Sequence, residues 1–395
     1  MERLENTVRD YAWGSATDIP DFLGVQAEGG PVAELWLGAH PDSPSRVHRG
    51  GDLRSLAEVI AAQPEAELGP ELTERFGPRL PFLLKVISAA RPLSLQVHPA
   101  KEHAARAYAA QQQGPGGPRD YTDDNHKPEV VCALRDGFAA LCGFRPLAGS
   151  RALLAELDVP GLDWLAGRLD DRDAAGSLRE VVTGVLTGRG DRAAVIADVR
   201  AACEHVAGGG GPWRAACAAY AVVAAAYPDD PGVLVALLLN YVELAAGEAA
   251  FLGAGVPHCY LQGFGAELMA SSDNVLRAGL TSKRVNVPEL LRVLDFIPAG
   301  AQVLCAERDA GGSEAVYRTP VEDFRLSRLE PGGEQTGLPD GRPQILLCVE
   351  GTTWLRDAAG TRLELRRGQS AFIPARESGV TLGGQAIVLR ATAAL

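Results

Sequence analysis

The residue pattern of this chain changes twice along its length, and these changes restrict the folds that it can adopt. Residues 1–145 and 231–395 contain short apolar runs with strand-like alternation, separated by turns rich in glycine and proline. Residues 146–230 are instead rich in alanine, leucine, arginine and aspartate, with apolar residues at helical spacing. The sequence therefore predicts a mainly β chain interrupted by an α-helical insert.

A glycine-rich turn pattern recurs in the later β segments. Gly247, Gly253 and Gly255 lead to His258 with five, one and two residues between them, which follows the turn pattern of cupin (jelly-roll) barrels. Gly368 begins the same pattern again, but no histidine follows there. Two cupin-type β-barrels are therefore predicted, and only the first is expected to bind a metal.

These patterns predict how the chain divides into domains. The catalytic cupin domain is expected to consist of residues 1–145 and 231–300, since strands on both sides of the insert must close one barrel. Residues 146–230 form the helical insert, and residues 301–395 form a C-terminal cupin-like domain without metal ligands.

Local patterns also predict individual elements. Apolar spacing indicates helices, and runs of β-branched and apolar residues indicate strands. We expect strands at residues 11–15, 33–45, 80–90 and 91–99, helices at 53–76 (broken at Pro64 and Pro70), 101–113 and 287–294, and hairpin turns at 350–351 and 359–360.

Composition excludes several classes of protein. With 46% hydrophobic and 22% charged residues the chain is typical of globular proteins, and its net charge of -12 argues against nucleic-acid binding. The odd number of cysteines, with no C-x-x-C pair, indicates reduced thiols. The most apolar stretch, residues 215–227, is shorter than the about 20 residues that span a bilayer, and the first residues lack a signal-peptide core. A cytoplasmic protein without membrane contact is expected.

Four residues are candidate metal ligands. Gln96 and His98, with Ser94, fall on one face of an alternating strand, although a polar solvent-facing strand would look similar. Glu129 opens an apolar strand, where a salt bridge is an equally good explanation. Together with His258 these residues offer two nitrogen and two oxygen ligands, which suits Zn²⁺ with an open position, while Mn²⁺, Fe²⁺ and Co²⁺ are not excluded.

A second polar group surrounds the predicted metal site. Residues 267–283 carry acids, an amide and two cations in one short span: Glu267, Asp273, Asn274, Arg277 and Lys283. Lys85 interrupts an apolar strand, which is costly unless it is paired or faces a site. The cations Lys85, Arg277 and Lys283 indicate an anionic substrate such as a sugar phosphate.

Four aromatic or histidine residues have simpler explanations. Trp13 and Trp36 are expected in the core. His40 precedes a proline in a turn and is expected at the surface, and His103 is expected to be exposed on its helix.

Taken jointly, these segments resemble the type I mannose-6-phosphate isomerase family, which comprises zinc-dependent cupin enzymes. The resemblance rests on six segments in the family's order, which cover nearly the whole chain: YAWGS, AELWLGAHP, LPFLLKVISAARPLSLQVHP, NHKPE, VPHCYLQG and SSDNVLRAGLTSK. Phe264 to Ala266 and Ser271 depart from the expected pattern, which bears on fine substrate preference and not on the reaction class.

The resemblance implies roles for these residues. One Zn²⁺ per chain is bound by Gln96, His98, Glu129 and His258, and Arg277 is the catalytic arginine. The pocket for a small sugar phosphate is lined by Ser94, Lys85, Lys127, Glu267, Asp273 and Lys283. Asp273 or Glu267 is favoured as the proton carrier, Lys127 is a further candidate, and His126 is expected to assist ring opening.

The implied reaction interconverts mannose 6-phosphate and fructose 6-phosphate through a cis-enediol, in a monomer or weak homo-oligomer. Three alternatives stay open: a non-catalytic sugar-phosphate-binding cupin, an isomerase of another aldose phosphate, and a cupin oxygenase. The acids beside the metal disfavour the first alternative. The glutamine ligand and the lysines disfavour the oxygenase.

Overall fold

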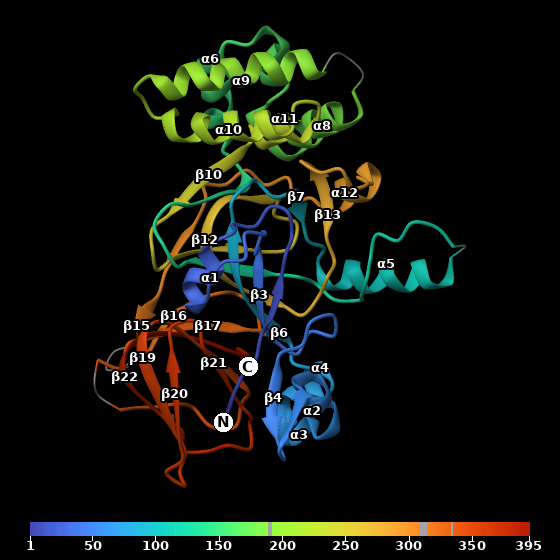
Figure 1. Cartoon of the computed structure of the whole chain (residues 1–395). Coiled ribbons are helices and arrows are strands. Elements are labelled where there is room, and N and C mark those ends of the chain that lie inside the picture. Colours follow the sequence, from blue (N-terminus) through green and yellow to red (C-terminus); the bar gives the residue numbers. More distant parts are fainter. Residues whose placement is uncertain (115, 189–191, 309–313, 333–334) are drawn as a thin grey trace.

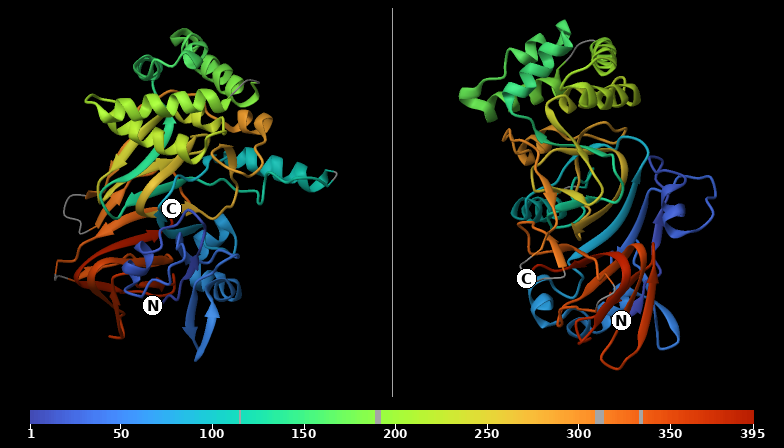
Figure 2. Two further views of the ribbon diagram at one scale, coloured as in Figure 1. Left: turned by 45° about the horizontal axis from the view of Figure 1, so that its top comes forward. Right: turned by 90° about the vertical axis from the view of Figure 1, so that its left-hand side faces the viewer.

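The computed structural model of the chain describes residues 1–114, 116–188, 192–308, 314–332 and 335–395. A helical layer, a larger sheet and a smaller sheet follow one another from top to bottom in Figure 1. The helical layer comes from the middle of the chain, and further views show it on one end of the larger sheet (Figure 2). The prediction of a mainly β chain with an α-helical insert is confirmed. The domain boundaries stay a prediction.

The larger sheet combines strands from both sides of the helical layer, and its strands pair antiparallel. Its main path runs in the order β14 (Val303–Cys305), β11 (Glu248–Leu252), β8 (Glu129–Ala133), β12 (His258–Ala270), β6 (Phe82–Ala89), β3 (Glu34–Gly38) and β2 (Thr7–Arg9). Four further strands join this path through β12 or through one another: β7 (Leu95–Val97), β9 (Phe138–Phe144), β10 (Leu239–Leu244) and β13 (Leu276–Gly279).

Strand β12 brings the candidate site together. Its first residue, His258, pairs with Gln96 of β7, while Glu267 further along pairs with Lys85 of β6. Gly263 lies between these two halves at φ +133, where a Cβ atom would lie 2.7 Å from the Cα atom of Phe138. A side chain does not fit there, so glycine allows the strand to continue from one set of partners to the next.

The smaller sheet is formed mainly by the C-terminal part of the chain. Its order is β1 (Glu2–Arg3), β21 (Ser370–Ile373), β19 (Gln344–Arg356), β22 (Thr381–Thr392), β17 (Arg325–Leu329), β16 (Glu314–Tyr317) and β15 (Glu307–Arg308), with β18 (Thr336–Gly337) on β22 and β20 (Arg362–Arg366) on β19. Strand β1 at the start of the chain pairs with β21, so the two ends of the chain lie in one sheet.

The hairpin turn expected at residues 350–351 is wrong. Strand β19 continues through this point, and its register against β22 shifts between Cys348 and Glu350. Gly351 has φ +75, and a Cβ atom on it would lie 2.1 Å from the carbonyl oxygen of Gln385. The glycine therefore serves a β-bulge and not a chain reversal. The turn expected at residues 359–360 is confirmed between β19 and β20.

The two sheets share a hydrophobic core. Phe264 and Leu268 of β12 belong to the same buried cluster as Leu347, Phe372 and Leu389 of the smaller sheet. Burial of apolar surface contributes about 25 cal/mol per Å², so a shared cluster of this kind holds the two sheets as one body.

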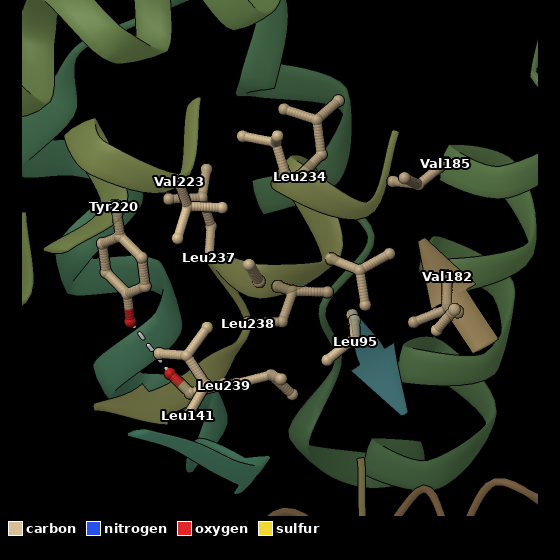
Figure 3. Close-up of a cluster of buried hydrophobic side chains, with 14 of the residues drawn as sticks. Leu95, Leu141, Val182, Val185, Tyr220, Val223, Leu234, Leu237, Leu238 and Leu239 are labelled. Carbon is tan, nitrogen blue, oxygen red and sulfur yellow. Dashed lines mark hydrogen bonds between the residues drawn. The ribbon is translucent and has the colours of Figure 1, made fainter. Parts of the chain in front are cut away.

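The helical layer lies over the edge of the larger sheet that carries β7 and β9. It consists of α6 (Leu147–Leu157), α7 (Asp163–Ala166), α8 (Ala174–Thr187), α9 (Arg192–Gly208), α10 (Arg214–Ala226) and α11 (Gly232–Ala236). Figure 3 shows Leu238 and Val182 of α8 beside Leu95 of β7, and Val223 of α10 near Leu237, in one buried cluster. Tyr220 of α10 donates a hydrogen bond to the carbonyl oxygen of Leu239, which fixes the helix to the start of β10.

Shorter helices lie beside the smaller sheet and around the larger one. The helical stretch expected at residues 53–76 is present as α2 (Leu56–Ala62), α3 (Pro64–Leu68) and α4 (Pro70–Phe76), after the small hairpin β4 (Arg46–Arg49) and β5 (Asp52–Ser55). Pro64 and Pro70 occupy the first turns of α3 and α4, as proline requires. The other helices are α1 (Asp18–Leu23), α5 (Lys101–Gln113) and α12 (Val287–Val293), the last two as predicted.

Several predicted strands are shorter than expected. Residues 11–15 form a turn with isolated bridges from Gly14 to Ala89 and from Ser15 to Val32. The strands expected at 33–45 and 91–99 are reduced to β3 and β7. Within the described residues no helix has the length and apolarity required to cross a membrane. The cysteines, which all lie in the described ranges, are free.

A fully buried carboxylate joins the α2–α4 region to the smaller sheet. Glu67 of α3 accepts a hydrogen bond from Arg49 at 2.7 Å and pairs with Arg376, which follows β21. Replacement of Glu67 with glutamine is expected to lower the free energy of unfolding by about 1–3 kcal/mol, because two guanidinium groups lose the negative charge that they share. Urea denaturation would measure this loss.

Glu65→Gln provides the matched control, since Glu65 is an exposed carboxylate on the same helix. Its unfolding midpoint is expected to equal that of the unmodified chain. Equal midpoints for both variants would contradict a stabilising role for Glu67.

Candidate active site

Three buried residues with metal-ligand chemistry converge where β7, β8 and β12 meet. His98 follows β7, Glu129 begins β8 and His258 begins β12. Ligand atoms of the three side chains lie within 4.8 Å of one another. The Nε2 atom of His98 lies 3.3 Å from Oε1 of Glu129, and Nε2 of His258 lies 3.4 Å from Oε2 of the same carboxylate. The sheet thus gathers residues separated by more than a hundred positions.

The orientation of both histidines fits a metal ion. Nδ1 of His98 contacts the carbonyl oxygen of Asn274 at 2.8 Å, and Nδ1 of His258 contacts that of Val256 at 3.0 Å. A carbonyl oxygen can only accept a hydrogen bond, so each Nδ1 carries the hydrogen and each Nε2 presents a lone pair. Nε2 of His98 is buried without a hydrogen-bond partner among the described residues. An unpartnered lone pair facing a carboxylate is the environment that a divalent cation completes.

Gln96, the fourth predicted ligand, lies on the strand next to His258 and could offer its side-chain amide oxygen to a metal ion. It lies opposite His258 in the β7–β12 pair and opposite Arg277 in the β7–β13 pair. Its side chain is half-buried and lines the neighbouring cleft. The sequence-predicted ligands Gln96, His98, Glu129 and His258 are thus neighbours in space, and their role as a set stays a prediction.

The protonation states of the buried trio favour metal binding at neutral pH. Burial lowers the pKa of His98 to about 4, so its ring is neutral. Burial acts to raise the pKa of Glu129, but the positive charge of Lys127 at 2.9 Å outweighs it and holds that pKa well below its usual range. A neutral imidazole and an ionised carboxylate are the forms that bind a metal ion.

A cleft of about 1250 Å³ lies beside the trio, between the larger sheet and the helical layer. Leu186 of α8 and Ala226 of α10 contribute one wall. The sequence-predicted residues in its lining are Lys85, Ser94, Gln96, Asp273, Arg277 and Lys283. His98, Glu129, His258, Lys127 and Glu267 are buried below this surface. Basic, acidic and hydroxyl groups therefore surround one cavity that is large enough for a sugar phosphate.

Lys85 is the centre of a buried charge network. Its Nζ atom lies 3.6 Å from Glu267 and 3.9 Å from Glu34, and 4.8 Å from the centre of the Trp36 ring. Burial acts to lower the pKa of Lys85, but Glu34 and Glu267 outweigh it and raise that pKa. Burial, with the charge of Glu129, raises the pKa of Glu267 to about 7. One carboxyl group in the site can therefore hold a proton near neutral pH.

Three residues of this network were not predicted as site residues: Glu34 and Tyr260 were not considered, and Trp36 was expected only in the core. Trp36 donates from Nε1 to Glu34 at 2.6 Å, and Tyr260 donates from its hydroxyl to Glu267 at 2.7 Å. Two signals were available. Glu34 interrupts an apolar strand in the same way as Lys85 does, and Trp36, two positions later, shares its strand face. Tyr260 follows His258 by two positions and so shares the strand face of that histidine. Trp13, expected in the core, also lines the cleft together with Trp36.

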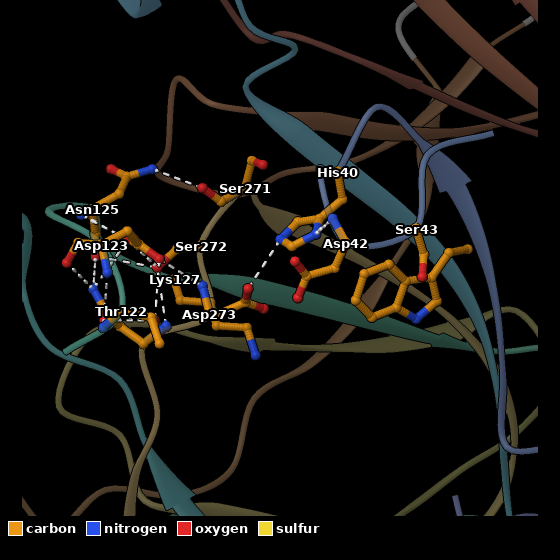
Figure 4. A network of polar contacts seen from close by, with 12 residues as sticks. His40, Asp42, Ser43, Thr122, Asp123, Asn125, Lys127, Ser271, Ser272 and Asp273 are labelled. Atoms are coloured by element: carbon orange, nitrogen blue, oxygen red, sulfur yellow. Dashed lines mark hydrogen bonds and ion pairs between the residues drawn. The ribbon is translucent and has the colours of Figure 1, made fainter. Parts of the chain in front are cut away.

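The expectation for His40 is wrong. This residue is buried, and its Nε2 atom lies 3.2 Å from Oδ2 of Asp273 in the cleft (Figure 4). Local sequence suggested a surface turn, whereas the fold turns this residue inward against Trp36. His103 is likewise half-buried and bonds Glu289 at 2.7 Å, instead of being exposed.

His126 does not join the cleft. Its Nε2 atom lies 2.9 Å from Oδ2 of Asp323, which precedes β17 of the smaller sheet. The neighbouring Lys127 turns the other way and reaches Glu129. The chain therefore presents His126 to the smaller sheet and Lys127 to the buried trio.

Two family models match separate parts of the chain. The family model "Phosphomannose isomerase type I, catalytic domain" matches residues 1–147, and "Mannose-6-phosphate isomerase, cupin domain" matches residues 313–393. The chain is 39% identical to mannose-6-phosphate isomerase of Escherichia coli, over 99% of each chain. It is 32% identical to the human mannose-6-phosphate isomerase, over 95% of this chain and 93% of that one.

Solved structures show the same likeness in three dimensions. A crystal structure of phosphomannose isomerase from Salmonella typhimurium with an arginine replaced by alanine superimposes with a TM-score of 0.91. The two chains are 38% identical and are covered completely. A variant of the same enzyme with a histidine replaced by alanine gives the same TM-score. Matches in sequence and structure over the full length establish that this chain belongs to the type I phosphomannose isomerase family.

Proposed function

We propose that this chain interconverts mannose 6-phosphate and fructose 6-phosphate with the aid of one bound Zn²⁺. The observation that carries the proposal is the buried trio of His98, Glu129 and His258 beside a cleft lined by cations and Asp273. Its relatives, named mannose-6-phosphate isomerases, match it over nearly its full length. A small sugar phosphate is thus the proposed partner, and the cytoplasm the proposed compartment.

Gln96, His98, Glu129 and His258 would hold the ion. When bound, zinc supplies positive charge toward an oxygen of the substrate, which lowers the energy of a developing oxyanion. Glu129 is already ionised and both Nε2 atoms are free of protons, so these residues need no rearrangement of protons to bind it.

The cations of the cleft bind and orient the substrate. Among the described residues, no hydrogen bond or ion pair occupies the guanidinium group of Arg277, which lies next to the predicted ligand Gln96 in the β7–β13 pair. A free guanidinium group binds a phosphate or enediolate oxygen by charge-assisted hydrogen bonds. Ser94 and Lys283 line the same cleft and would contribute a hydroxyl group and a second positive charge.

Asp273 is the residue best placed to move the proton between C1 and C2. It lines the cleft, whereas Glu267 is buried beneath Lys85. The hydrogen bond from His40 lowers the pKa of Asp273, with help from Lys127 and Lys85, so the carboxylate is ionised and able to accept a proton. Glu267 would set the charge of Lys85. The intermediate of this proton transfer is a cis-enediol.

A coupled assay of fructose 6-phosphate formation from mannose 6-phosphate tests the proposal. The protein is assayed as purified, after chelator treatment and after zinc is restored, and its metal content is measured at each stage. We expect turnover that is lost with the metal and regained with zinc. A folded, zinc-containing protein without turnover would refute the proposed reaction and would favour a binding role. Restoration by another metal alone would refute zinc.

A further inference from the structure

We propose that His40 is a positioning residue that fixes the Asp273 carboxylate for proton transfer. This inference rests on the proposed function, because it concerns the same reaction. His40 lies after β3, far from Asp273 in sequence, and its side chain is 5% exposed. The contact of 3.2 Å between Nε2 and Oδ2 therefore joins the segment after β3 to the connection between β12 and β13 (Figure 4).

The surroundings of His40 determine which nitrogen carries its proton. The backbone N–H of Asp42 donates to Nδ1 at 3.3 Å, so Nδ1 is an acceptor and Nε2 carries the hydrogen. The ring packs edge-to-face on Trp36, with the two centres 5.0 Å apart and the planes at 85°. His40 is thus held from two sides, with its N–H directed at Asp273.

The same evidence separates this histidine from a metal ligand. His40, Asp42 and Asp273 offer ligand atoms within 4.8 Å of one another, as a cation site would. A metal ion needs the lone pair of a ring nitrogen, however, and here one nitrogen accepts a hydrogen bond while the other donates one. A hydrogen-bonding role accounts for both contacts.

The main chain at Asp273 is fixed independently of His40. Its backbone N–H donates to Oδ2 of Asp123 at 2.8 Å, and Ser272 donates to the other oxygen of Asp123 at 2.8 Å. Figure 4 shows this group beside the His40 contact. Asp123 therefore fixes where the residue lies, but it leaves the Asp273 side chain free to rotate.

The side chain of Asp273 needs such a contact because it is 42% exposed in an open cleft. His40 and Asp42 lie beside this carboxylate, and the positive charges of Lys85 and Lys127 attract it. Without the N–H of His40, the carboxylate would sample rotamers directed toward water and toward either lysine. A base that leaves its position by about 1 Å can lose about 100-fold in rate.

Two replacements of His40 test the inference, each made alone and together with Asp273→Asn in the zinc-loaded enzyme. His40→Leu removes the donor, and His40→Gln restores an amide N–H. We expect His40→Leu to lower kcat by about 10–100-fold with little change in KM. His40→Gln should recover much of this loss. In the Asp273→Asn background neither change should lower kcat further, because the two residues act as one unit.

His103→Leu is the matched control, since His103 also bonds a carboxylate, Glu289, but lies outside the cleft lining. It should leave kcat unchanged within about two-fold. If His40→Leu does not fold, His40→Asn, whose shorter amide does not span the gap, replaces it. Wild-type kcat in the donor-free variant, or an equal loss in both backgrounds, overturns the inference while the proposed function stands. An inactive wild-type enzyme overturns both.

Discussion

Replacement of His98 with alanine is expected to abolish metal binding and turnover in a chain that still folds. His98 is fully buried, its Nδ1 is held by the carbonyl oxygen of Asn274 and its Nε2 has no partner among the described residues. Loss of a partner that only orients a ligand already weakens metal affinity by about 10–100-fold, so loss of a ligand should exceed about 100-fold. Metal content after dialysis and the coupled assay measure both effects.

The ion pair between Lys127 and Glu129 adds to the loss of metal affinity. In the His98 variant Glu129 keeps its contact of 2.9 Å with Lys127, and this lysine competes with a metal ion for the carboxylate. His103→Ala, which removes a histidine bonded to Glu289, should keep its metal and its activity. A full zinc complement in the His98 variant would contradict the ligand assignment.

Replacement of Arg277 with alanine is expected to lower turnover by about 100–1000-fold, because removal of one preorganised charge-stabilising group costs about this much. Metal content and unfolding midpoint should not change. The half-buried guanidinium group has no hydrogen-bond or ion-pair partner among the described residues, so its removal breaks no polar contact with them. The coupled assay, together with zinc analysis and thermal denaturation, separates these effects.

Arg284→Ala is the control for this experiment. Arg284 is an exposed arginine nearby that pairs with Asp120 at 2.7 Å, and its loss changes the net charge by the same amount. Its turnover should be close to that of the unmodified enzyme. Retained turnover in a folded, zinc-loaded Arg277 variant would refute the catalytic role of this residue.

Where local chemistry dominates, the sequence predicted the structure closely. The helix at residues 101–113 is present as α5, and Pro64 and Pro70 separate α2, α3 and α4. Alternation in the stretch around Gln96 placed the candidate ligands on one strand face, although only three residues there form a strand. A proline or a helical spacing of apolar residues affects the backbone within a few residues. Its effect can therefore be predicted without the rest of the fold.

Prediction failed where distant segments decide the outcome. Glu350 and Gly351 are residue types that favour a turn. In the structure β19 nevertheless continues through them, because both residues pair with β22 next to a β-bulge. His126 and Lys127 are adjacent, yet one reaches Asp323 and the other Glu129. The roles assigned to the individual site residues stay predictions.

The sequence alone determined that the chain is mainly β with a helical insert, because the spacing of apolar residues that distinguishes strands from helices is visible within short stretches of sequence. It also named six residues that line the cleft, Lys85, Ser94, Gln96, Asp273, Arg277 and Lys283, but it missed Glu34 and misplaced His40. Only the tertiary structure decided how they meet: β12 aligns His258 with Gln96 at one end and Glu267 with Lys85 further along. It also buried His40 against Asp273, since burial depends on contacts between residues that lie far apart in the chain.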